Sequence, residues 1–327
     1  MRIHFTLLDL APIVKTEPTG RNRGALFLLH FRHMARQRLG QHFLSDAAWR
    51  EQIARAIGVS PPLQLPSSTV TPPPVTSVRE TSSPEVPALA PQPSHCWIEV
   101  GAGHGEMTGH LVATHVPVYA IELDALLLGK LQRLGKKTPN LTVVAGDVLE
   151  TDLAALAAGR RIHIYGNLPY YITSPILHHF FDFADQIDEI HIVIQEEVAS
   201  RLAATPHTKQ YGYLSVAAQL YTRPKIVLRI PRQAFSPPPE VGSALVTMRL
   251  PGERAKLGLR DETAYLDFVK FCFSKKRKTL VNNLRAFAKP DAVREALAAQ
   301  GLRPDARAEQ LTLSHFAALS AALGPAR

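Results

Sequence analysis

The sequence of 327 residues predicts an α/β protein, in which a mostly parallel β-sheet is followed by a small all-α domain. Short runs rich in β-branched residues alternate with helical patterns, which is typical of parallel strands joined by crossover helices. Two later runs are separated by a proline-rich loop and predict an antiparallel pair that closes the sheet edge. From about Glu262 onward only helical periodicity remains.

Three stretches precede the predicted sheet. Residues 1–33 show no clean period, and the basic MARQRLGQHFLSD segment begins at Met34. We interpret Met34 as the start of translation, or 1–33 as a loose extension, with an Arg-rich transit peptide as the alternative. A helix is predicted over about 46–58. Residues 60–94 then hold ten of the 26 prolines, and this composition predicts a disordered insert.

Five runs predict the parallel strands, and two helical patterns lie between them. In chain order the strand runs are HCWIEVG, VYAIELD, LTVVAGDV, HIYGN and EIHIVIQ, and the helical ones are DALLLGKLQRLGKK and SPILHHFFDFA. A further helix over about 213–221 precedes KIVLRIP and SALVTMRL, the predicted antiparallel pair. The pattern therefore predicts a main domain over 34–252 and a helical domain over 258–327.

Composition limits the classes of function. The formal charge of +9 is typical of a protein with a polyanionic partner, either nucleic acid or an anionic membrane surface, but composition alone is equally compatible with a basic protein that has no such partner. The two cysteines, Cys96 and Cys272, have no metal-ligand spacing and form no disulfide framework. The apolar run ALFLLHF is too short to span a bilayer. We therefore expect a cytoplasmic protein without a metal or a membrane anchor.

The run WIEVGAGHGEMTGHL predicts a strand, a glycine-rich turn and a helix, as at a nucleotide site. Gly101, Gly103 and Gly105 let the backbone approach a ligand without a Cβ clash. Glu122 ends the second strand, where a carboxylate can accept both ribose hydroxyls, and Asp147 ends the third, beside an adenine amino group. NAD and S-adenosylmethionine remain open as ligands, although the G-x-G-x-G spacing argues against NAD. Glycines of a tight turn without a ligand are the alternative.

The fourth strand delivers an Asn-Leu-Pro-Tyr stretch to the same rim. If the substrate is the exocyclic amine of adenine, the Asn167 side-chain oxygen and the Leu168 carbonyl can each accept one N–H. Pro169 stiffens the loop, and Tyr170 offers a face on which a flipped base can stack. Positioning then supplies most of the rate, without a metal or a strong general base. A proline turn with a buried tyrosine is the alternative.

Several motifs follow one another in a fixed order along most of residues 36–285: RQRLGQHFLSD, IEVGAGHGEMT, IELD, GDVL, YGNLPYYITSPIL, IQEEVASRL, YGYLSVAAQ, FSPPPEVGSALV and KKRKTLVNNL. Together they resemble the rRNA adenine N6,N6-dimethyltransferase family, most closely its bacterial small-subunit (16S) branch. The resemblance implies a Rossmann-like S-adenosylmethionine-dependent methyltransferase sheet with a small all-α C-terminal domain. It also implies dimethylation of N6 of two adjacent adenosines in the 3′-terminal hairpin of 16S rRNA, during small-subunit biogenesis.

Carried over residue by residue, the resemblance implies that the S-adenosylmethionine contacts are made by His42, Leu44, Gly101, Glu122, Asp147 and Asn167, with Gly103 in the same turn. His42 departs from the family, which more often has Asn in this motif. Phe235, in FSPPPEVGS, resembles the second aromatic residue of the base pocket, with a core phenylalanine as the alternative. Residues 1–33 and the proline-rich insert have no family counterpart.

RNA binding has a separate basis in the stretch 268–290, which carries seven Lys or Arg and no Asp or Glu. One-sided charge suits phosphate contacts, whereas a solvated helix face usually carries both signs. The predicted RNA surface consists of Lys275, Lys276, Arg277 and Lys278, together with Arg36 and Arg38. The two glutamates at 196–197 are interpreted as helix-start residues. The expected partner is 16S rRNA within the immature small subunit, bound by a monomer.

Two rival functions remain open at this point. A non-catalytic RNA- or DNA-binding factor could keep the same fold, although the intact set of Gly101, Glu122, Asp147 and Asn167 argues against lost catalysis. A large-subunit adenine methyltransferase of the resistance type would keep the chemistry and change the RNA. The LGQHFL and KKRKTLVNNL blocks favour the small subunit.

Overall fold

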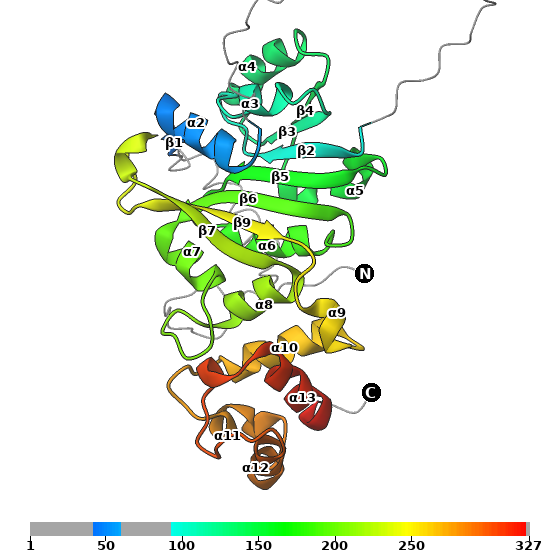
Figure 1. Ribbon diagram of the computed structural model, residues 1–327, viewed down its shortest axis with the longest axis vertical. Coiled ribbons are helices and arrows are strands. Elements are labelled where there is room, and N and C mark those ends of the chain that lie inside the picture. The colour runs from blue at the N-terminus through cyan, green and yellow to red at the C-terminus, as the bar shows by residue number, and fades with distance from the viewer. Residues whose placement is uncertain (1–41, 60–92, 325–327) are drawn as a thin grey trace, which may run out of the picture. The chain divides into compact units, whose positions relative to one another are not determined.

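A seven-stranded sheet forms the centre of the larger of two units, which comprises Phe43–Thr205 and Leu214–Arg254 (Figure 1). This computed structural model describes residues 42–59 and 93–324. The strand order is β4-β3-β2-β5-β6-β9-β7. The strands are β2 (His95–Val100), β3 (Val118–Glu122), β4 (Leu141–Ala145), β5 (Arg161–Asn167), β6 (Ile187–Gln195), β7 (Arg223–Ile230) and β9 (Ser243–Arg249).

The topology confirms the predicted α/β class. The strands from β4 to β6 run parallel, whereas β9 is antiparallel to both β6 and β7. The strand order reverses between β2 and β5, so their carboxyl ends form the switch point where such sheets bind ligands. The predicted pairing of β7 with β9 is confirmed, but β9 inserts beside β6 and leaves β7 at the edge. β9 is almost wholly buried, whereas β7 alternates between exposed and half-buried residues.

One face of the sheet packs against α2 (Ala47–Ala56). Ile53 and Ala54 of this helix are fully buried in one cluster with Trp97 of β2 and Tyr165 of β5. The strands themselves are near-continuous apolar runs, as expected for a parallel sheet that is buried on both sides. This packing holds the strand ends rigidly, which a binding rim built on them requires.

Several helices begin at a side-chain cap that the sequence provides. Asp46, Asp124 and Asp261 each accept a hydrogen bond from a backbone N–H in the first turn of α2, α4 and α10. The predicted helices over 46–58 and 213–221 are confirmed as α2 and α8. The helices after α2 are α3 (Thr108–Val112), α4 (Ala125–Gly135), α5 (Leu153–Ala157), α6 (Thr173–Phe181), α7 (Glu196–Leu202), α8 (Tyr213–Tyr221), α9 (Arg254–Leu257), α10 (Glu262–Cys272), α11 (Leu280–Asn283), α12 (Pro290–Ala299) and α13 (Leu313–Leu323).

The helices of the described residues are short. The longest helices that the structure describes have 11 residues, and none of them is long and apolar enough to cross a membrane.

α7 begins at Glu196 and carries Glu196 and Glu197 in its first turn, which confirms their interpretation as helix-start residues. Glu196 also forms an ion pair with Arg229, with 2.6 Å between carboxylate oxygen and Nε.

A short ribbon joins two segments that lie far apart in the sequence. β1 (Phe43–Leu44) pairs antiparallel with β8 (Phe235–Ser236), so that Leu44 lies opposite Phe235. Phe43 and Leu44 are thereby fixed to the start of the loop that contains the SPPPEVGS motif. No local sequence signal predicts this pairing, because each strand has only two residues.

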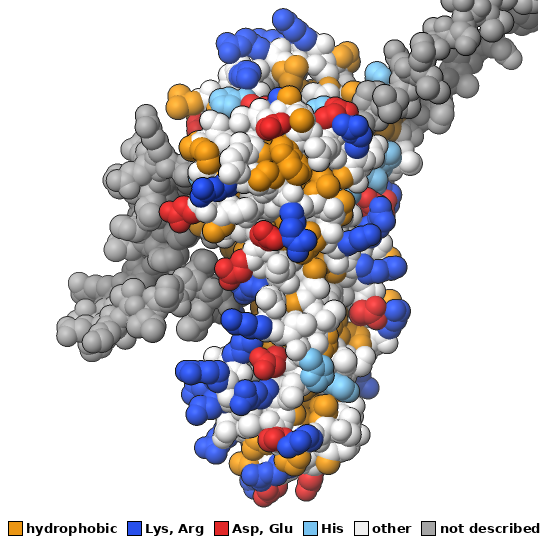
Figure 2. All heavy atoms as spheres, turned by 60° about the vertical axis from the view of Figure 1, so that its left-hand side comes forward, with side chains coloured by type: hydrophobic (Ala, Val, Ile, Leu, Met, Phe, Trp, Pro, Cys, Tyr) orange, Lys and Arg blue, Asp and Glu red, His pale blue; other side chains and the backbone are white. Residues whose placement is uncertain are grey.

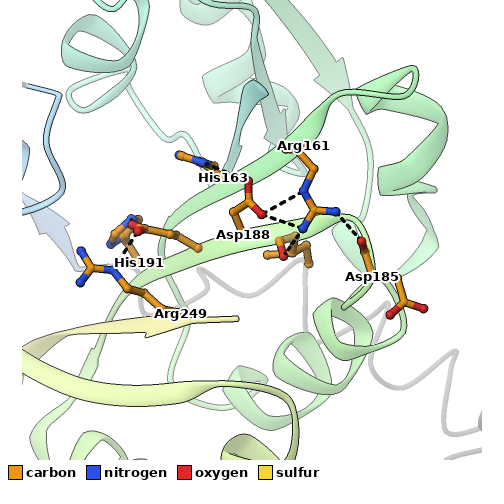
Figure 3. A network of polar contacts seen from close by, with 8 residues as sticks. Arg161, His163, Asp185, Asp188, His191 and Arg249 are labelled. Atoms are coloured by element: carbon orange, nitrogen blue, oxygen red, sulfur yellow. Dashed lines mark hydrogen bonds and ion pairs between the residues drawn. The ribbon is translucent and has the colours of Figure 1, made fainter. Parts of the chain in front are cut away.

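A network of ion pairs links the start of β5 and the start of β6 to the end of the antiparallel strand β9 (Figure 3). Arg161 of β5 contacts Asp188 of β6 with 2.6 Å between Nη2 and Oδ1. Glu189 lies 3.0 Å from His191 Nε2 and 2.8 Å from Arg249 Nε. The contact with His191, helped by Arg249, lowers the pKa of Glu189 to about 2 against the partial burial of the carboxyl. These contacts cross-link β5, β6 and β9.

The second unit contains the C-terminal helices from Ala255 onward and also the loop Pro206–Tyr213. That loop belongs to the predicted main domain by sequence position, but its contacts bind it to the helices. His207 N donates to Glu309 O at 2.7 Å, and the ring of Tyr211 lies 6.0 Å from that of Phe273. The predicted boundaries at 252 and 258 place this loop in the main domain and therefore miss its contacts with the helical unit. The predicted extension 1–33 lies outside the described residues, as does most of the insert 60–94.

Candidate active site

The carboxyl ends of three neighbouring parallel strands meet beside the switch point. Gly101 follows β2, Glu122 ends β3, and Asn167 ends β5. Gly101 N donates to Ile121 O at 2.9 Å, and a Cβ placed on Gly101 would lie 3.9 Å from the Asn167 carbonyl oxygen. The predicted site residues from β2, β3 and β5 therefore share one rim.

The glycine-rich turn adopts a backbone that only glycine takes without strain. Gly101, Gly103 and Gly105 have φ values of +68°, +59° and +86°. A Cβ on Gly103 would lie 3.2 Å from a ring carbon of Phe43, and the centroid of the Phe43 ring lies 4.7 Å from that of the His104 ring, with the two planes tilted by 41°. Phe43 of β1 therefore covers the turn, a contact that sequence spacing does not indicate.

Glu122 holds the turn from below. Its side chain is 3% exposed, its Oε2 accepts a hydrogen bond from Gly103 N at 2.8 Å, and its Oε1 accepts one from Asp124 N at 2.8 Å. Each carboxylate oxygen keeps a second lone pair, so the predicted contact with ribose hydroxyls remains open to it. Glu122 thus has a structural role in addition to the predicted binding role.

Asp147 lies two residues beyond the end of β4, which closes at Ala145 rather than at Asp147 as predicted. Its Oδ1 accepts a hydrogen bond from Leu149 N at 2.9 Å and caps a short 3-10 turn, Val148–Glu150. The carboxylate also lies close enough to Tyr171 to add to the raised pKa of that phenol, which is due first to burial. Its second oxygen is available to an adenine amino group.

The first segment of the chain reaches the site through β1. Leu44 is 5% exposed and faces Phe235, which is 2% exposed, in the core under the ribbon. The Phe235 ring is thus packed into the core, which favours the core interpretation, and its base-pocket role stays a prediction. His42 lies half-buried immediately before β1, and its cofactor contact also stays a prediction.

The Asn-Leu-Pro-Tyr loop is held rigidly at both ends. The Leu168 side chain is 1% exposed, and Leu168 N donates to Val193 O at 3.0 Å. The Pro169 carbonyl accepts a 3.0 Å hydrogen bond from Thr173 Oγ1 at the start of α6. Among the described residues no hydrogen bond occupies the Leu168 carbonyl, which is the backbone acceptor proposed for the substrate amine.

Tyr170 is oriented by a residue that lies far along the sequence but at the same rim of the sheet. Its hydroxyl lies 2.9 Å from the Oγ of Ser243, the fully buried first residue of β9. Partial burial raises the pKa of Tyr170 against the opposing effect of this hydrogen bond, so the phenol is neutral at physiological pH. The sequence motif FSPPPEVGSALV contains Ser243, but its spacing gave no reason to connect Ser243 with Tyr170.

Sequence reasoning did not identify two further residues, Gly166 in β5 and Tyr171 in the loop after it. A Cβ on Gly166 would lie 2.8 Å from Leu168 Cδ2 and 3.2 Å from Val100 O, so β2, β5 and the loop meet too closely for a side chain. A glycine inside a strand run was the available signal. Tyr171 is 44% exposed beside Tyr170 and offers a second aromatic face at the rim.

The predicted RNA-binding residues of the helical unit lie in a turn rather than on a helix face. Lys275–Lys278 are exposed in the connection between α10 and α11. Asn283 fixes this turn, because its Nδ2 donates to Cys272 O at 2.7 Å and to Lys275 O at 3.2 Å. Figure 2 shows Lys and Arg side chains outnumbering acidic ones on the face it draws. Arg36 and Arg38 lie outside the described residues.

The rim fits a nucleoside cofactor that carries positive charge. The glycines keep their positions in the turn free of side chains, and a Cβ on Gly101 would project into the space between the turn and the Asn167 carbonyl, 3.9 Å from that oxygen. Glu122 and Asp147 suit ribose hydroxyls and an adenine amino group, and their negative charge suits a sulfonium. The donor set is therefore that of an S-adenosylmethionine site.

Comparison with known proteins agrees with this arrangement. A family model described as ribosomal RNA adenine dimethylase matches residues 32–323. A ribosomal RNA small subunit methyltransferase A of Acidobacterium capsulatum is 42% identical over 224 residues, covering 68% of this chain and 79% of that protein. The protein of the same name from Xanthomonas campestris pv. campestris is 34% identical over 286 residues, covering 88% of this chain and 95% of that protein.

Two solved structures share the fold. A dimethyladenosine transferase from Plasmodium falciparum has a TM-score of 0.59 at 22% identity, covering 68% of this chain and 88% of that one. The 23S rRNA methyltransferase ErmE has a TM-score of 0.57 at 22% identity, covering 84% of this chain and 98% of that one. At this identity the likeness extends to the fold and not to the RNA that is modified.

Proposed function

This chain belongs to the ribosomal RNA adenine dimethylase family, and on that premise we propose which of its residues carry out the reaction. It is an S-adenosylmethionine-dependent methyltransferase that dimethylates adenine in small-subunit rRNA. We place the reaction at N6 of two adjacent adenosines in the 3′-terminal hairpin. The observation that supports this site most strongly is the close approach of the Asn167 carbonyl to the glycine-rich turn.

Asn167 and Leu168 prepare the amine of the substrate. The nitrogen lone pair of adenine N6 is delocalised into the ring, so the free base is a poor nucleophile. The Asn167 side-chain oxygen and the Leu168 carbonyl each accept one N–H, which draws the nitrogen toward tetrahedral geometry. S-adenosylmethionine supplies a methyl group on a positively charged sulfur. Bound at this rim, the cofactor would give its methyl group to the nitrogen and leave as a neutral thioether, and the amine proton would pass to water.

The second methylation needs less from the loop. After the first transfer the amine keeps one N–H, so a single acceptor suffices to orient its lone pair. Two acceptors on one rigid loop can therefore serve both steps without rearrangement. Pro169 and the bond from Thr173 keep the loop in one shape, so the reacting atoms are held close and most of the rate comes from positioning.

Tyr170 holds the flipped base through its ring. A base taken out of its stack costs a few kcal/mol, and stacking on an aromatic face returns about 1–3 kcal/mol. The hydrogen bond to Ser243 keeps the ring in one orientation. Lys275–Lys278 bind phosphates of the rRNA. We further propose that the protein acts as a monomer in the cytoplasm, without a metal.

Transfer of labelled methyl groups tests the assignment. Immature small subunits that lack the modification should accept about four methyl groups each, because two adenosines each take two. Primer extension should then stop at two adjacent adenosines in the 3′-terminal hairpin. Binding without transfer would favour a non-catalytic RNA-binding factor, and transfer to large-subunit rRNA alone would favour the resistance-type reaction.

A further inference from the structure

Glu99 is a carboxylic acid buried beneath the glycine-rich turn, and the reaction described above does not use it. It belongs to β2 and is 2% exposed. Its Oε2 accepts a 2.5 Å hydrogen bond from Oγ1 of Thr108, the first residue of α3. The bond joins the strand before the turn to the helix after it, so Glu99 influences the shape of the turn.

The other polar groups near Glu99 are acidic or neutral. Tyr165 of β5 lies opposite Glu99 in the strand register, and among the described residues its buried hydroxyl has no hydrogen-bond partner. Glu106 of the turn and Glu122 of β3 are the charged groups that act on Glu99. A buried hydroxyl without a partner is costly, and it points here to an acceptor that forms in another state of the site.

Burial raises the pKa of Glu99 to about 8, against the opposing effect of the Thr108 hydrogen bond. The negative charges of Glu106 and Glu122 raise it further. In the free protein near pH 7 this carboxyl therefore keeps its proton. A positive charge brought to the turn would reverse the balance, because an opposite charge within about 4–6 Å favours the ionised form.

We propose that Glu99 is a positioning residue that gives up its proton when the positively charged cofactor binds at the turn. The inference rests on the proposed function, because it takes S-adenosylmethionine as the ligand. Once ionised, Glu99 accepts stronger, charge-assisted bonds from Thr108 and from the unpartnered Tyr165 hydroxyl. The turn is then stiffened by cofactor binding, through residues that do not touch the substrate.

The linkage has a definite sign. The free protein holds the proton below pH about 8, and the complex does not. Cofactor binding therefore releases about one proton near pH 7, and the affinity tightens by up to about tenfold per pH unit between pH 6 and 8.

Calorimetry can measure this release directly. Wild-type protein is titrated with S-adenosylmethionine at pH 7 in two buffers of different ionisation enthalpy. The Glu99→Gln variant is then compared, since it keeps an oxygen acceptor for the Thr108 hydroxyl but has no titrating proton. The amino group of the cofactor also titrates, but it contributes equally to both proteins. The difference between them should be about one proton, and the affinity of the variant should depend less on pH.

A matched control and a spectroscopic readout keep the proposal falsifiable. Glu106→Gln removes a half-buried carboxylate from the same turn and should reduce the proton release only in part, because the charge of Glu106 is a smaller cause of the raised Glu99 pKa than burial is. Infrared difference spectra of the wild-type protein should lose a protonated-carboxyl band on cofactor binding. This measurement tests the proposal even if the Glu99→Gln variant does not fold. Tight cofactor binding without proton release, or equal release in Glu99→Gln, would overturn the inference. Failure of wild type to bind the cofactor would instead overturn the proposed function.

Discussion

Asn167 ends β5 where that strand comes closest to the glycine-rich turn, so a role in cofactor binding and a role at the substrate amine must be separated by experiment. We expect Asn167→Ala to reduce methyl transfer by roughly 100-fold or more, because it removes one preorganised acceptor. The Kd for S-adenosylmethionine should change by only about threefold or less, since the carbonyl and the glycine backbone remain. Single-turnover transfer and calorimetric binding measure the two quantities. An equal loss of both would assign Asn167 to the cofactor alone.

The Tyr170–Ser243 bond can be tested by a double-mutant cycle. Tyr170→Phe and Ser243→Ala each remove one side of the 2.9 Å contact and keep the stacking ring. Each should lower kcat/KM by roughly 2- to 10-fold, which corresponds to a hydrogen bond of about 0.5–1.5 kcal/mol. The double variant should be no worse than either single one, because the same interaction is lost. Strictly additive losses would show that the two residues act independently.

At the scale of the element, β5 approaches β2 and its own loop too closely for a side chain at Gly166. A methyl group there would meet Leu168 Cδ2 at 2.8 Å and Val100 O at 3.2 Å, so Gly166→Ala should destabilise the protein by about 1–3 kcal/mol. Gly129→Ala in α4 is the matched control, because nothing lies within 4 Å of its Cβ position. That variant should gain about 0.5–1 kcal/mol. Urea unfolding measures the free energy of unfolding of both variants. An unchanged free energy in Gly166→Ala would mean that β2 and β5 can move apart easily.

The turn between α10 and α11 presents its positive charges from a fixed backbone. Replacing Lys275 and Arg277 by Gln should weaken rRNA binding and reduce the slope of log K against log salt by roughly 1.5, at about 0.7–0.9 per lost phosphate contact. The control replaces Lys136 and Lys137, which are exposed at the end of α4, and should leave the slope unchanged. Equal changes in both variants would indicate a response to net charge rather than a phosphate-binding turn.

At the scale of the whole molecule, the proline-rich insert separates two parts of one core. Val59 before it is 4% exposed, and β2 begins at His95 after it. Replacing 61–93 by a short Gly/Ser linker should preserve cooperative unfolding and methyl transfer, because the flanking residues keep their packing and loop closure depends weakly on length. Thermal unfolding and labelled-methyl transfer are the measurements. A variant that folds but does not transfer methyl groups would show that the insert has a role.

Much of the architecture was predictable because it depends on local patterns. Apolar runs in β2 to β6 and the helical pattern of α4 are set by the periodicity of neighbouring residues. The glycine-rich turn was predictable for a similar reason, since three closely spaced glycines require an unusual backbone. The strand order at this edge of the sheet was only partly predictable. β7 and β9 would pair with each other whichever of them lay beside β6, and only their burial in the fold shows that β7 is the edge strand.

Some features of the site also follow from adjacent residues, whereas others depend on contacts that only the fold creates. The sequence by itself determined the α/β class, the residues at the carboxyl ends of the strands and the Asn-Leu-Pro-Tyr chemistry, because these follow from adjacent residues. Only the tertiary structure decided that Phe43 covers Gly103, that Ser243 orients Tyr170 and that Glu99 bonds to Thr108 below the turn. Two of these contacts join segments far apart in the chain, and the third depends on the angle at which α3 leaves the turn. Sequence spacing carries no information on such contacts, since folding alone sets the distances between their atoms.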